Sequence, residues 1–369
     1  MKFTVLKEKL YPFLQYAGNF TTTKNLSTIL QNVLIEAADN KITIKSTNFQ
    51  TGFSCTIDAN VTEPGATTAP AKKLTDIVKE LPDGKEIDFT FDGSRLHVKA
   101  GRSAFQLSTM DQELFPRSAV INPEYSFTID SDTYISLLKR IVFCIANDTS
   151  KPEYNGAHMS LFADRIEFSS ADYQRIATAE AALEGTFTDE FIANIPKKTA
   201  LDIIKIFDGA GPITIETDKR QIIFKTASLS MTSKLIEKYI RNLTRLFLIE
   251  YNLRATINRT LLMEVVRRIS AITSEITHGV QLSFASNQLT VTSLETELGK
   301  GNEVIEGVQF ESEPIDIIFN ARHLLEILGN TNAENIEFAM NTKTQPALIL
   351  PDNQEAKYLL VPISIEKLS

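Results

Sequence analysis

Few residues in this chain have the types and spacing that chemistry requires. His323 and Glu326 lie one turn apart on a predicted helix, which suits a pair of metal ligands, but no second histidine lies near them in sequence. Asp130 and Asp132 could hold a metal as paired carboxylates, yet they stand where the N-cap of a helix is expected. We therefore interpret this acidic pair as capping residues rather than as a metal site.

The other reactive side chains are isolated along the chain. The sequence contains no glycine-rich phosphate loop, no nucleophile elbow and no paired-histidine zinc motif. Cys55 and Cys144 form no CxxC pair and are expected to be reduced, buried thiols. The sequence therefore predicts a protein without catalytic residues, metal or cofactor, and its scattered histidines are expected to be structural or on the surface: His97, His158, His278 and His323.

Positive charge gathers on segments that have the apolar spacing of helices. In 71–81, Leu74, Ile77 and Val78 form one apolar stripe, whereas Lys72 and Lys73 point elsewhere. Lysine and arginine outnumber aspartate and glutamate in five such segments and balance them in the sixth, although the chain has a formal net charge of −8. Solvated helix faces often collect charge, but basic helices against an acidic remainder favour contact with DNA phosphates without base readout. The six segments are 6–17, 71–81, 131–146, 196–207, 259–272 and 320–329.

The helix in 71–81 belongs to a unit that the chain repeats twice more. A helical segment followed by strand patterns begins at Pro70, at Pro196 and at Phe319, and a predicted hairpin precedes each copy. The period of about 125 residues is far longer than the roughly 20–50 residues of a solenoid unit. The sequence therefore predicts three complete α+β domains, each with two helices packed on antiparallel sheet. Their expected bounds are 1–122, 123–249 and 250–369.

No part of the sequence is expected to enter a membrane. No window approaches the roughly 18 consecutive apolar residues of a transmembrane helix. Lys7, Glu8 and Lys9 interrupt the N-terminal stretch where a signal peptide would be apolar, so we expect a cytoplasmic protein. Pro12 falls inside the first predicted helix and should kink or shorten it, unless the helix begins near that proline.

Several stretches taken together resemble the bacterial DNA polymerase III beta subunits, the sliding clamps. They are MKFTV at the start, LSTILQNVL at 26–34, GATTAPAKKLTDI at 65–77, GRSAFQLSTMDQELFP at 101–116, TSKLIE at 232–237 and YLLVPISI at 358–365. The resemblance covers essentially the whole chain. It implies that two three-domain subunits join head to tail into a homodimer, a six-domain ring whose helices face the hole.

The resemblance also implies partners rather than a reaction. Such a ring encircles double-stranded DNA without reading its sequence and tethers the replicative polymerase, which raises the effective concentration of that polymerase at the primer end. The implied protein partners are the DNA polymerase III alpha subunit, the clamp loader delta subunit, and other polymerases and repair proteins that carry short clamp-binding peptides. The expected location is the nucleoid in the cytoplasm, with no membrane partner.

The resemblance carries three sets of residues over to this chain. The family's DNA-contact positions fall on Lys24, Lys72, Asp148 and 151–153, although Asp148 and Glu153 would repel phosphate. With the basic helices included, the candidate DNA-binding residues are Lys24, Lys72, Lys73, Lys151, Lys197 and Lys198. The candidate dimer interface is Phe105, Leu107 and Ile272, for which an ordinary core position is the alternative. The candidate pocket for partner peptides is Tyr154, Tyr173, Arg175, Ile176, Arg245, Leu246, Pro346, Leu359, Val361, Pro362 and Ile363.

The pocket residues depart from the family pattern in ways that leave alternatives open. Tyr173 should narrow the groove, Arg241 should add a charge beside it, and Ser364 replaces a usual arginine. These departures allow a divergent clamp with altered partner peptides. A DNA-processing enzyme is the alternative from another class, and the missing carboxylate or metal cluster counts against it.

Overall fold

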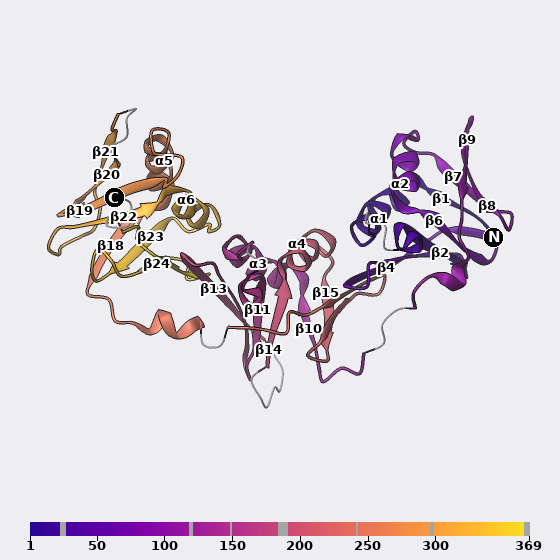
Figure 1. The fold of residues 1–369 in the computed structure, drawn as a ribbon, viewed down its shortest axis with the longest axis horizontal. Coiled ribbons are helices and arrows are strands. Elements are labelled where there is room, and N and C mark those ends of the chain that lie inside the picture. The colour runs from indigo at the N-terminus through magenta and orange to yellow at the C-terminus, as the bar shows by residue number, and fades with distance from the viewer. Residues whose placement is uncertain are drawn as a thin grey trace. The chain divides into compact units, whose positions relative to one another are not determined.

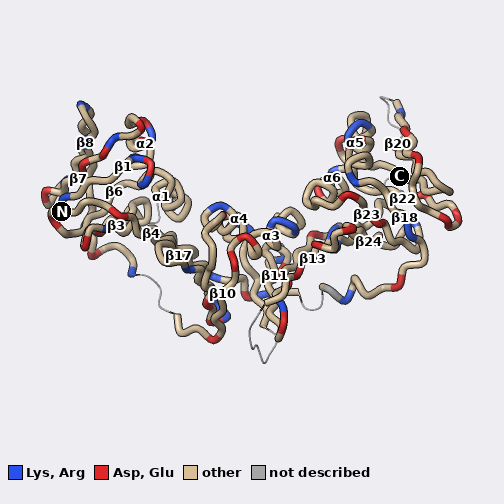
Figure 2. Tube along the Cα trace, turned by 180° about the vertical axis from the view of Figure 1, so that it is seen from behind, with Lys and Arg blue, Asp and Glu red and all other residues tan. Residues whose placement is uncertain are grey.

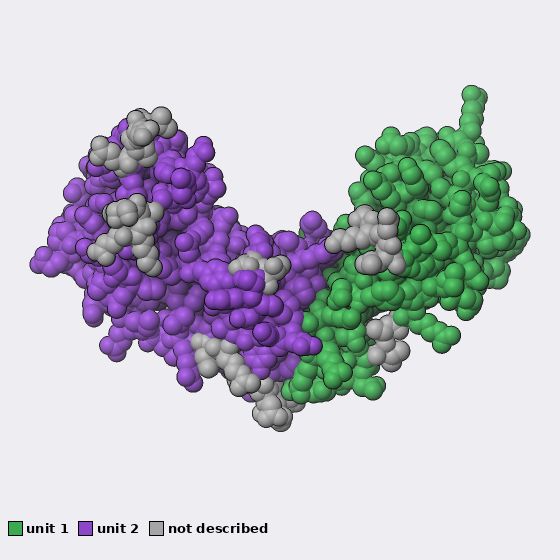
Figure 3. All heavy atoms as spheres, viewed as in Figure 1, with its two compact units in different colours: residues 1–131, 206–235 green, residues 132–205, 236–369 purple. Residues whose placement is uncertain are grey.

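The computed structural model describes residues 1–22, 27–117, 121–147, 150–183, 191–240, 243–294 and 299–364, without the side chain of Thr244. The described chain divides into two compact units, coloured separately in Figure 3. Unit 1 contains residues 1–131 and 206–235, and unit 2 contains residues 132–205 and 236–369. The chain therefore enters unit 1, passes to unit 2, returns to unit 1 and ends in unit 2.

The six predicted helices are confirmed. They are α1 (Lys7–Asn19), α2 (Ala71–Glu80), α3 (Ser131–Ile141), α4 (Lys197–Ile206), α5 (Arg259–Ser270) and α6 (Ala321–Gly329). Helix α3 ends earlier than predicted because Val142–Cys144 forms a 3-10 turn. The other 3-10 turns are Thr28–Gln31, Gln112–Leu114, Pro152–Tyr154 and Leu243–Leu248.

Helix α1 is not shortened at Pro12, because it begins at Lys7 and continues to Asn19. Its apolar face, Leu10, Leu14 and Ala17, is at most 2% exposed. Helices in proteins owe most of their stability to such tertiary packing, and here it outweighs the one backbone hydrogen bond that proline cannot donate.

Unit 1 holds two antiparallel sheets, with α1 and α2 packed side by side against strands of both (Figure 1). The five-stranded sheet has the order β5 (Asn60–Glu63), β1 (Lys2–Leu6), β7 (Glu86–Phe91), β8 (Arg95–Ala100) and β9 (Ser103–Ser108). The eight-stranded sheet has the order β10 (Tyr125–Asp130), β15 (Pro212–Thr217), β16 (Gln221–Lys225), β17 (Leu229–Lys234), β4 (Thr51–Asp58), β3 (Lys41–Thr47), β2 (Asn32–Ala38) and β6 (Gly65–Pro70).

Unit 2 repeats this plan. Its eight-stranded sheet has the order β14 (Phe191–Pro196), β11 (Gly156–Leu161), β12 (Arg165–Ala171), β13 (Arg175–Ala182), β25 (Lys357–Leu360), β24 (Ala347–Pro351), β23 (Asn335–Met340) and β18 (Leu253–Asn258). Its four-stranded sheet has the order β21 (Asn302–Glu306), β20 (Gln288–Ser293), β19 (Gly279–Ala285) and β22 (Ile315–Asn320). Helices α5 and α6 pack on each other, and α5 also covers β20 and β21.

Each eight-stranded sheet is shared by two successive repeats of the sequence. The last strand of the second repeat, β17, pairs with the fourth strand of the first repeat, β4, and the last strand of the third repeat, β25, pairs in the same way with β13 of the second. The last strand of the first repeat, β9, and the fourth strand of the third repeat, β21, have no partner from another repeat among the described residues. Both lie at the edge of their sheet.

Candidate functional site

A cavity of about 480 Å³ lies in unit 2 where β13 pairs with β25. Its floor is apolar, because Leu359 of β25 packs with Tyr251 and Leu348 in a buried cluster that Ile176 of β13 extends. Of the predicted pocket residues, it is lined by Tyr154, Tyr173, Arg175, Ile176, Leu246, Pro346, Leu359 and Val361. An apolar cleft with a few polar groups on its rim is the usual form of a ligand site.

Two tyrosines and a lysine form one rim of this cavity. The rings of Tyr154 and Tyr173 lie 5.1 Å apart, and the Lys151 ammonium lies 5.0 Å from the centre of the Tyr173 ring. Cation–π contacts of this kind are worth about 0.5–1 kcal/mol at exposed sites. Tyr173 is 50% exposed, so it covers the cavity mouth without being part of the core.

Arg175 lines the cavity but its charge is neutralised within the protein. Its guanidinium donates to Asp172 at 3.0 and 2.9 Å and forms an ion pair with Glu326 of α6. Burial lowers the pKa of Arg175, and the surrounding acidic groups raise it, with a net rise. The same arginine and His323 line an adjacent cavity of about 560 Å³. His323 and Glu326, whose spacing alone would suit a pair of metal ligands, therefore lie beside an arginine, which disfavours a bound cation.

The buried His158 is hydrogen-bonded to Ile240, which lies in the wall of the cavity. His158 of β11 is 1% exposed, and its Nε2 accepts a hydrogen bond from the backbone N–H of Ile240 at 3.0 Å. Burial lowers the pKa of His158 to about 4, so the ring is neutral near pH 7. Ile240 itself lines the cavity, and the position of this pocket wall therefore depends on an uncharged His158.

Some predicted pocket residues lie outside the lining. Arg245 is exposed on the 3-10 turn Leu243–Leu248, and the tail with Pro362 and Ile363 passes toward β22, where the Ile363 N–H donates to the Ile318 carbonyl at 2.8 Å. Arg241 lies outside the described residues. The lining also contains Asp172, Ile240, Leu243 and Ile249, which were not predicted from the sequence. For the last three, the available signal was a run of apolar residues in a segment without helix or strand periodicity.

The candidate DNA-contact lysines have different environments. Lys24 and Asp148 lie outside the described residues, while Lys72 and Lys73 are exposed on α2. Figure 2 shows Lys and Arg along α2, α4 and α5. Lys198 forms an ion pair with Asp202 at 2.7 Å. Of the candidate lysines that the structure describes, the two exposed lysines of α2 therefore have the fewest internal contacts.

Lys197 is only partly available to a phosphate. Its ammonium donates to the Ile145 carbonyl at 2.7 Å and to Asn147 Oδ1 at 3.0 Å. Burial and then the charge of Arg175 lower the pKa of Lys197. Lys151 is likewise engaged, since its ammonium lies over the pocket tyrosines.

The predicted interface residues lie on or near two of the edge strands, β9 and β21. Phe105 and Leu107 belong to β9, and Phe105 is 38% exposed. Ile272 follows α5 and lies against Gly299 and Gly301, next to β21. On β21 itself, Val304 is 49% exposed.

Both cysteines are buried free thiols, as predicted, and burial raises the pKa of Cys55 to about 12. Within the described ranges, no group of three or more His, Cys, Asp or Glu side chains could hold a metal ion. No described helix is both long enough and apolar enough to span a membrane.

Family models for the DNA polymerase III beta subunit match three successive parts of the chain. The N-terminal domain model matches residues 1–119, the central domain model residues 128–239 and the C-terminal domain model residues 244–364. A beta sliding clamp from Caulobacter vibrioides is 26% identical over 374 residues, which cover 99% of this chain and all of that protein.

Solved structures agree over the same length. The crystal structure of the DNA polymerase III subunit beta from Pseudomonas aeruginosa matches with a TM-score of 0.93 and 25% identity, covering 98% of this chain and 100% of that one. A sliding clamp from Bartonella birtlesii bound to griselimycin matches with a TM-score of 0.93 and 26% identity, covering 99% of each chain.

Proposed function

This chain belongs to the family of bacterial DNA polymerase III beta subunits and serves DNA replication as a sliding clamp, and we propose that it does so as a closed ring of two copies. The observation that carries the ring is that β9 and β21, alone among the described strands of their two kinds, have no partner from another repeat and lie at sheet edges. The antiparallel pairs β17–β4 and β25–β13 each join the last strand of one repeat to the fourth strand of the repeat before it. An equivalent pair between β9 of one copy and β21 of another would join the first repeat of one copy to the third repeat of the other. Two such head-to-tail contacts close a ring.

The composition of the two edges supports this pairing. Phe105 and Leu107 offer apolar side chains on β9, and Val304 and Ile272 offer apolar side chains at β21. Exposed, unpaired strands are templates for pairing with another chain. We assign the three domains of each copy to residues 1–122, 123–249 and 250–369.

In this proposal the ring is a non-catalytic processivity factor that holds double-stranded DNA. The exposed Lys72 and Lys73 would contact phosphates directly, with Lys24, Lys151, Lys197 and Lys198 adding positive charge. Such contacts are nonspecific and weaken as salt rises, which suits a protein that slides. The expected location is the nucleoid in the cytoplasm.

The unit 2 cavity would bind the partners. Its apolar floor and the Tyr154–Tyr173 rim fit a short peptide with apolar side chains, of the kind expected on the DNA polymerase III alpha subunit, the clamp loader delta subunit, and other polymerases and repair proteins. Tethering a polymerase to a ring on DNA raises its effective concentration at the primer end.

The test is retention on DNA of different topology. The protein is loaded on a nicked circular plasmid by a clamp loader, separated from free protein at high salt, and half of the sample is then linearised. We expect the protein to remain on the circle and to leave the linear DNA. Equal loss from both forms would contradict the ring, and a metal-dependent nuclease activity that survives repurification would favour an enzyme instead.

A further inference from the structure

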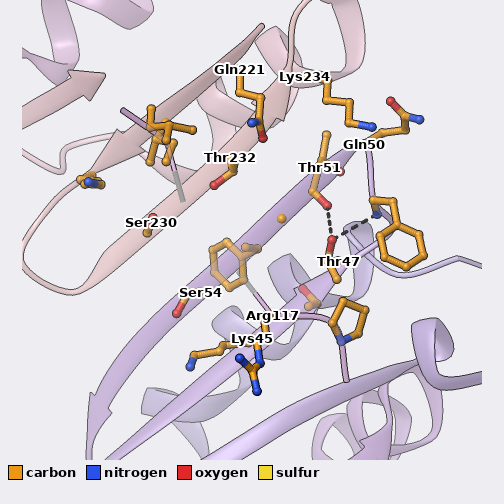
Figure 4. Close-up of a pocket in the computed structure, with 18 of the residues that line it drawn as sticks. Lys45, Thr47, Gln50, Thr51, Ser54, Arg117, Gln221, Ser230, Thr232 and Lys234 are labelled. Carbon is orange, nitrogen blue, oxygen red and sulfur yellow. Dashed lines mark hydrogen bonds between the residues drawn. The ribbon is translucent and has the colours of Figure 1, made fainter. Parts of the chain in front are cut away.

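A second cavity, of about 560 Å³, lies at the corresponding junction in unit 1, where β4 pairs with β17 (Figure 4). We call it the unit 1 groove. Strands β3, β4 and β15–β17 form its floor, and the segment Phe115–Arg117 with Ile121 forms its wall. In the unit 2 cavity, β13, β25 and residues of the segment 240–249 make the same arrangement. The groove therefore repeats, one domain earlier, the construction of the proposed peptide pocket.

The turns at the two sites share one hydrogen-bond pattern, although Phe49 has a positive φ and Tyr173 does not. Asn48 Oδ1 accepts hydrogen bonds from the backbone N–H groups of Gln50 at 3.0 Å and Thr51 at 2.8 Å. In the unit 2 turn, Asp172 Oδ1 accepts from Gln174 at 2.9 Å and Arg175 at 2.7 Å. Each turn thereby presents one aromatic side chain in the same position, Phe49 at the groove and Tyr173 at the cavity.

Phe49 lies at the rim of the groove in a backbone conformation that is unfavourable for phenylalanine. Its side chain is 58% exposed, and its backbone has φ of 68°, a left-handed conformation that is unfavourable for a residue with a bulky side chain. The Phe49 N–H donates to Thr47 Oγ1 at 3.1 Å, which stabilises this conformation. Backbone strain of about 1–3 kcal/mol of this kind concentrates at ligand-binding positions.

The unit 1 groove differs from the unit 2 cavity in charge. Lys45 and Arg117 lie at one end and Lys234 at the other (Figure 4), and Lys225 adds a fourth cation. Lys45 is paired with Glu36 and Lys225 with Glu216, the one acidic side chain in the lining. Arg117 and Lys234 are exposed and have no acidic partner among the described residues.

The groove opens on the sheet face opposite to α1. Alternate residues of β4 point to the two faces: Phe53 stacks on Phe20 and meets Tyr16 edge-on at α1, while Gly52 and Ser54 are half-buried on the other face. Helix α1, with the basic helix α2 packed beside it, is therefore on the other side of this sheet, which favours a peptide over a duplex as the groove's ligand.

We propose that the unit 1 groove binds a short extended peptide with an apolar anchor flanked by acidic side chains. Phe49, Phe115 and Ile121 would receive the anchor, and Arg117 and Lys234 would pair with the carboxylates. The clamp then has a second docking site per subunit, specific for peptides of different charge from those of the unit 2 cavity.

The test is a fluorescence anisotropy titration of the full-length protein with a fluorescein-labelled peptide of alternating aspartate and glycine around one phenylalanine. The charge-reversed double variant Arg117→Glu, Lys234→Glu should bind at least about tenfold more weakly than the unaltered protein. The matched control, Lys41→Glu, reverses an exposed lysine of β3 outside the groove and should leave affinity unchanged.

A second variant tests the groove by shape. A Cβ at Gly52 would have no neighbour closer than 3.8 Å, so Gly52→Leu should fold normally and still obstruct the floor. Leu246→Arg, which alters the unit 2 cavity, should not weaken the acidic peptide. The proposal is overturned if Gly52→Leu and the double variant bind normally, if Leu246→Arg abolishes binding, if a lysine-containing peptide binds equally well, or if duplex DNA displaces the peptide.

Discussion

Arg175 joins three parts of unit 2 through one side chain. Its guanidinium contacts Asp172 in the β12–β13 turn, Glu326 on α6 and the Phe143 carbonyl. Its side chain is only 7% exposed, so water contributes little to solvating the charge. An arginine buried in this way serves the shape of the peptide pocket, rather than offering a free charge to a ligand.

We predict that Arg175→Ala lowers the free energy of unfolding by about 3 kcal/mol. Removing one partner of a buried ion pair costs roughly 3–5 kcal/mol, and the lower end applies because Glu326 is half exposed. Urea denaturation measures the change. The control is Arg165→Ala, whose ion pairs with Asp164 and Glu180 are more exposed and should contribute less than about 1 kcal/mol. Equal losses in the two variants would contradict the structural role.

His158 should make unit 2 sensitive to acid. The pKa of His158 is lowered to about 4 in the folded protein, so the unfolded chain binds a proton more readily between about pH 6.5 and pH 4. The stabilising contribution is therefore complete above about pH 6.5 and decreases as pH falls toward 4. Protonation of Nε2 would also break its hydrogen bond with the Ile240 N–H.

We predict that His158→Gln loses less stability than the unaltered protein between pH 6.5 and 4.5. Glutamine can still accept from Ile240 but does not titrate. Over this range the unaltered protein should lose about 2–3 kcal/mol more of its free energy of unfolding than the variant does, measured by urea denaturation at several pH values. Parallel pH profiles for the two proteins would show that another group causes the acid sensitivity.

At the scale of elements, local sequence patterns predict the helices and strands, but they do not predict which strands pair. Helical spacing such as Leu74, Ile77 and Val78 and the alternation in the strands depend on neighbours in sequence, so all six helices and the repeat could be predicted. The pairing of β17 with β4 joins strands that are remote in sequence, and no local pattern encodes it. Ile240, Leu243 and Ile249 were missed as pocket residues for the same reason, because only the sheet junction brings them to the cavity.

The tight pairing of β11 with β14 leads to a prediction about Gly156. A Cβ at this position would overlap Asn194 Oδ1 and the Ile195 carbonyl oxygen. Gly156→Ala should therefore lower the free energy of unfolding by about 1–3 kcal/mol, as overpacking does. Gly52→Ala is the control in β4, where an added Cβ would make ordinary contacts at 3.8 Å or more, and it should be neutral or raise stability by up to about 1 kcal/mol. Thermal denaturation of both variants distinguishes them.

At the scale of the whole molecule, one chain has fewer junctions between repeats than it has repeats. Three repeats in one chain form two junctions, β17–β4 and β25–β13, and the strands of a third, β9 and β21, lie at opposite ends of the repeat order. In the proposed ring, a second copy supplies the partner for each of these two strands. The two edges carry groups of opposite charge: Arg102 precedes β9, and Glu306 lies on β21, where the neighbouring Glu303 is already paired with Arg268. This complementarity favours pairing of β9 with β21 over pairing of like edges.

We predict from this that Phe105→Arg weakens the dimer. Loss of an apolar anchor at an interface costs at least about 2 kcal/mol, or roughly thirtyfold in the dissociation constant. Sedimentation equilibrium over a dilution series should show single subunits at concentrations where the unaltered protein is a dimer. Leu114→Arg is the matched control, because Leu114 is 61% exposed and lies outside β9. If both variants dissociate equally, or if Phe105→Arg remains a dimer, the subunits associate through a surface other than the β9 edge.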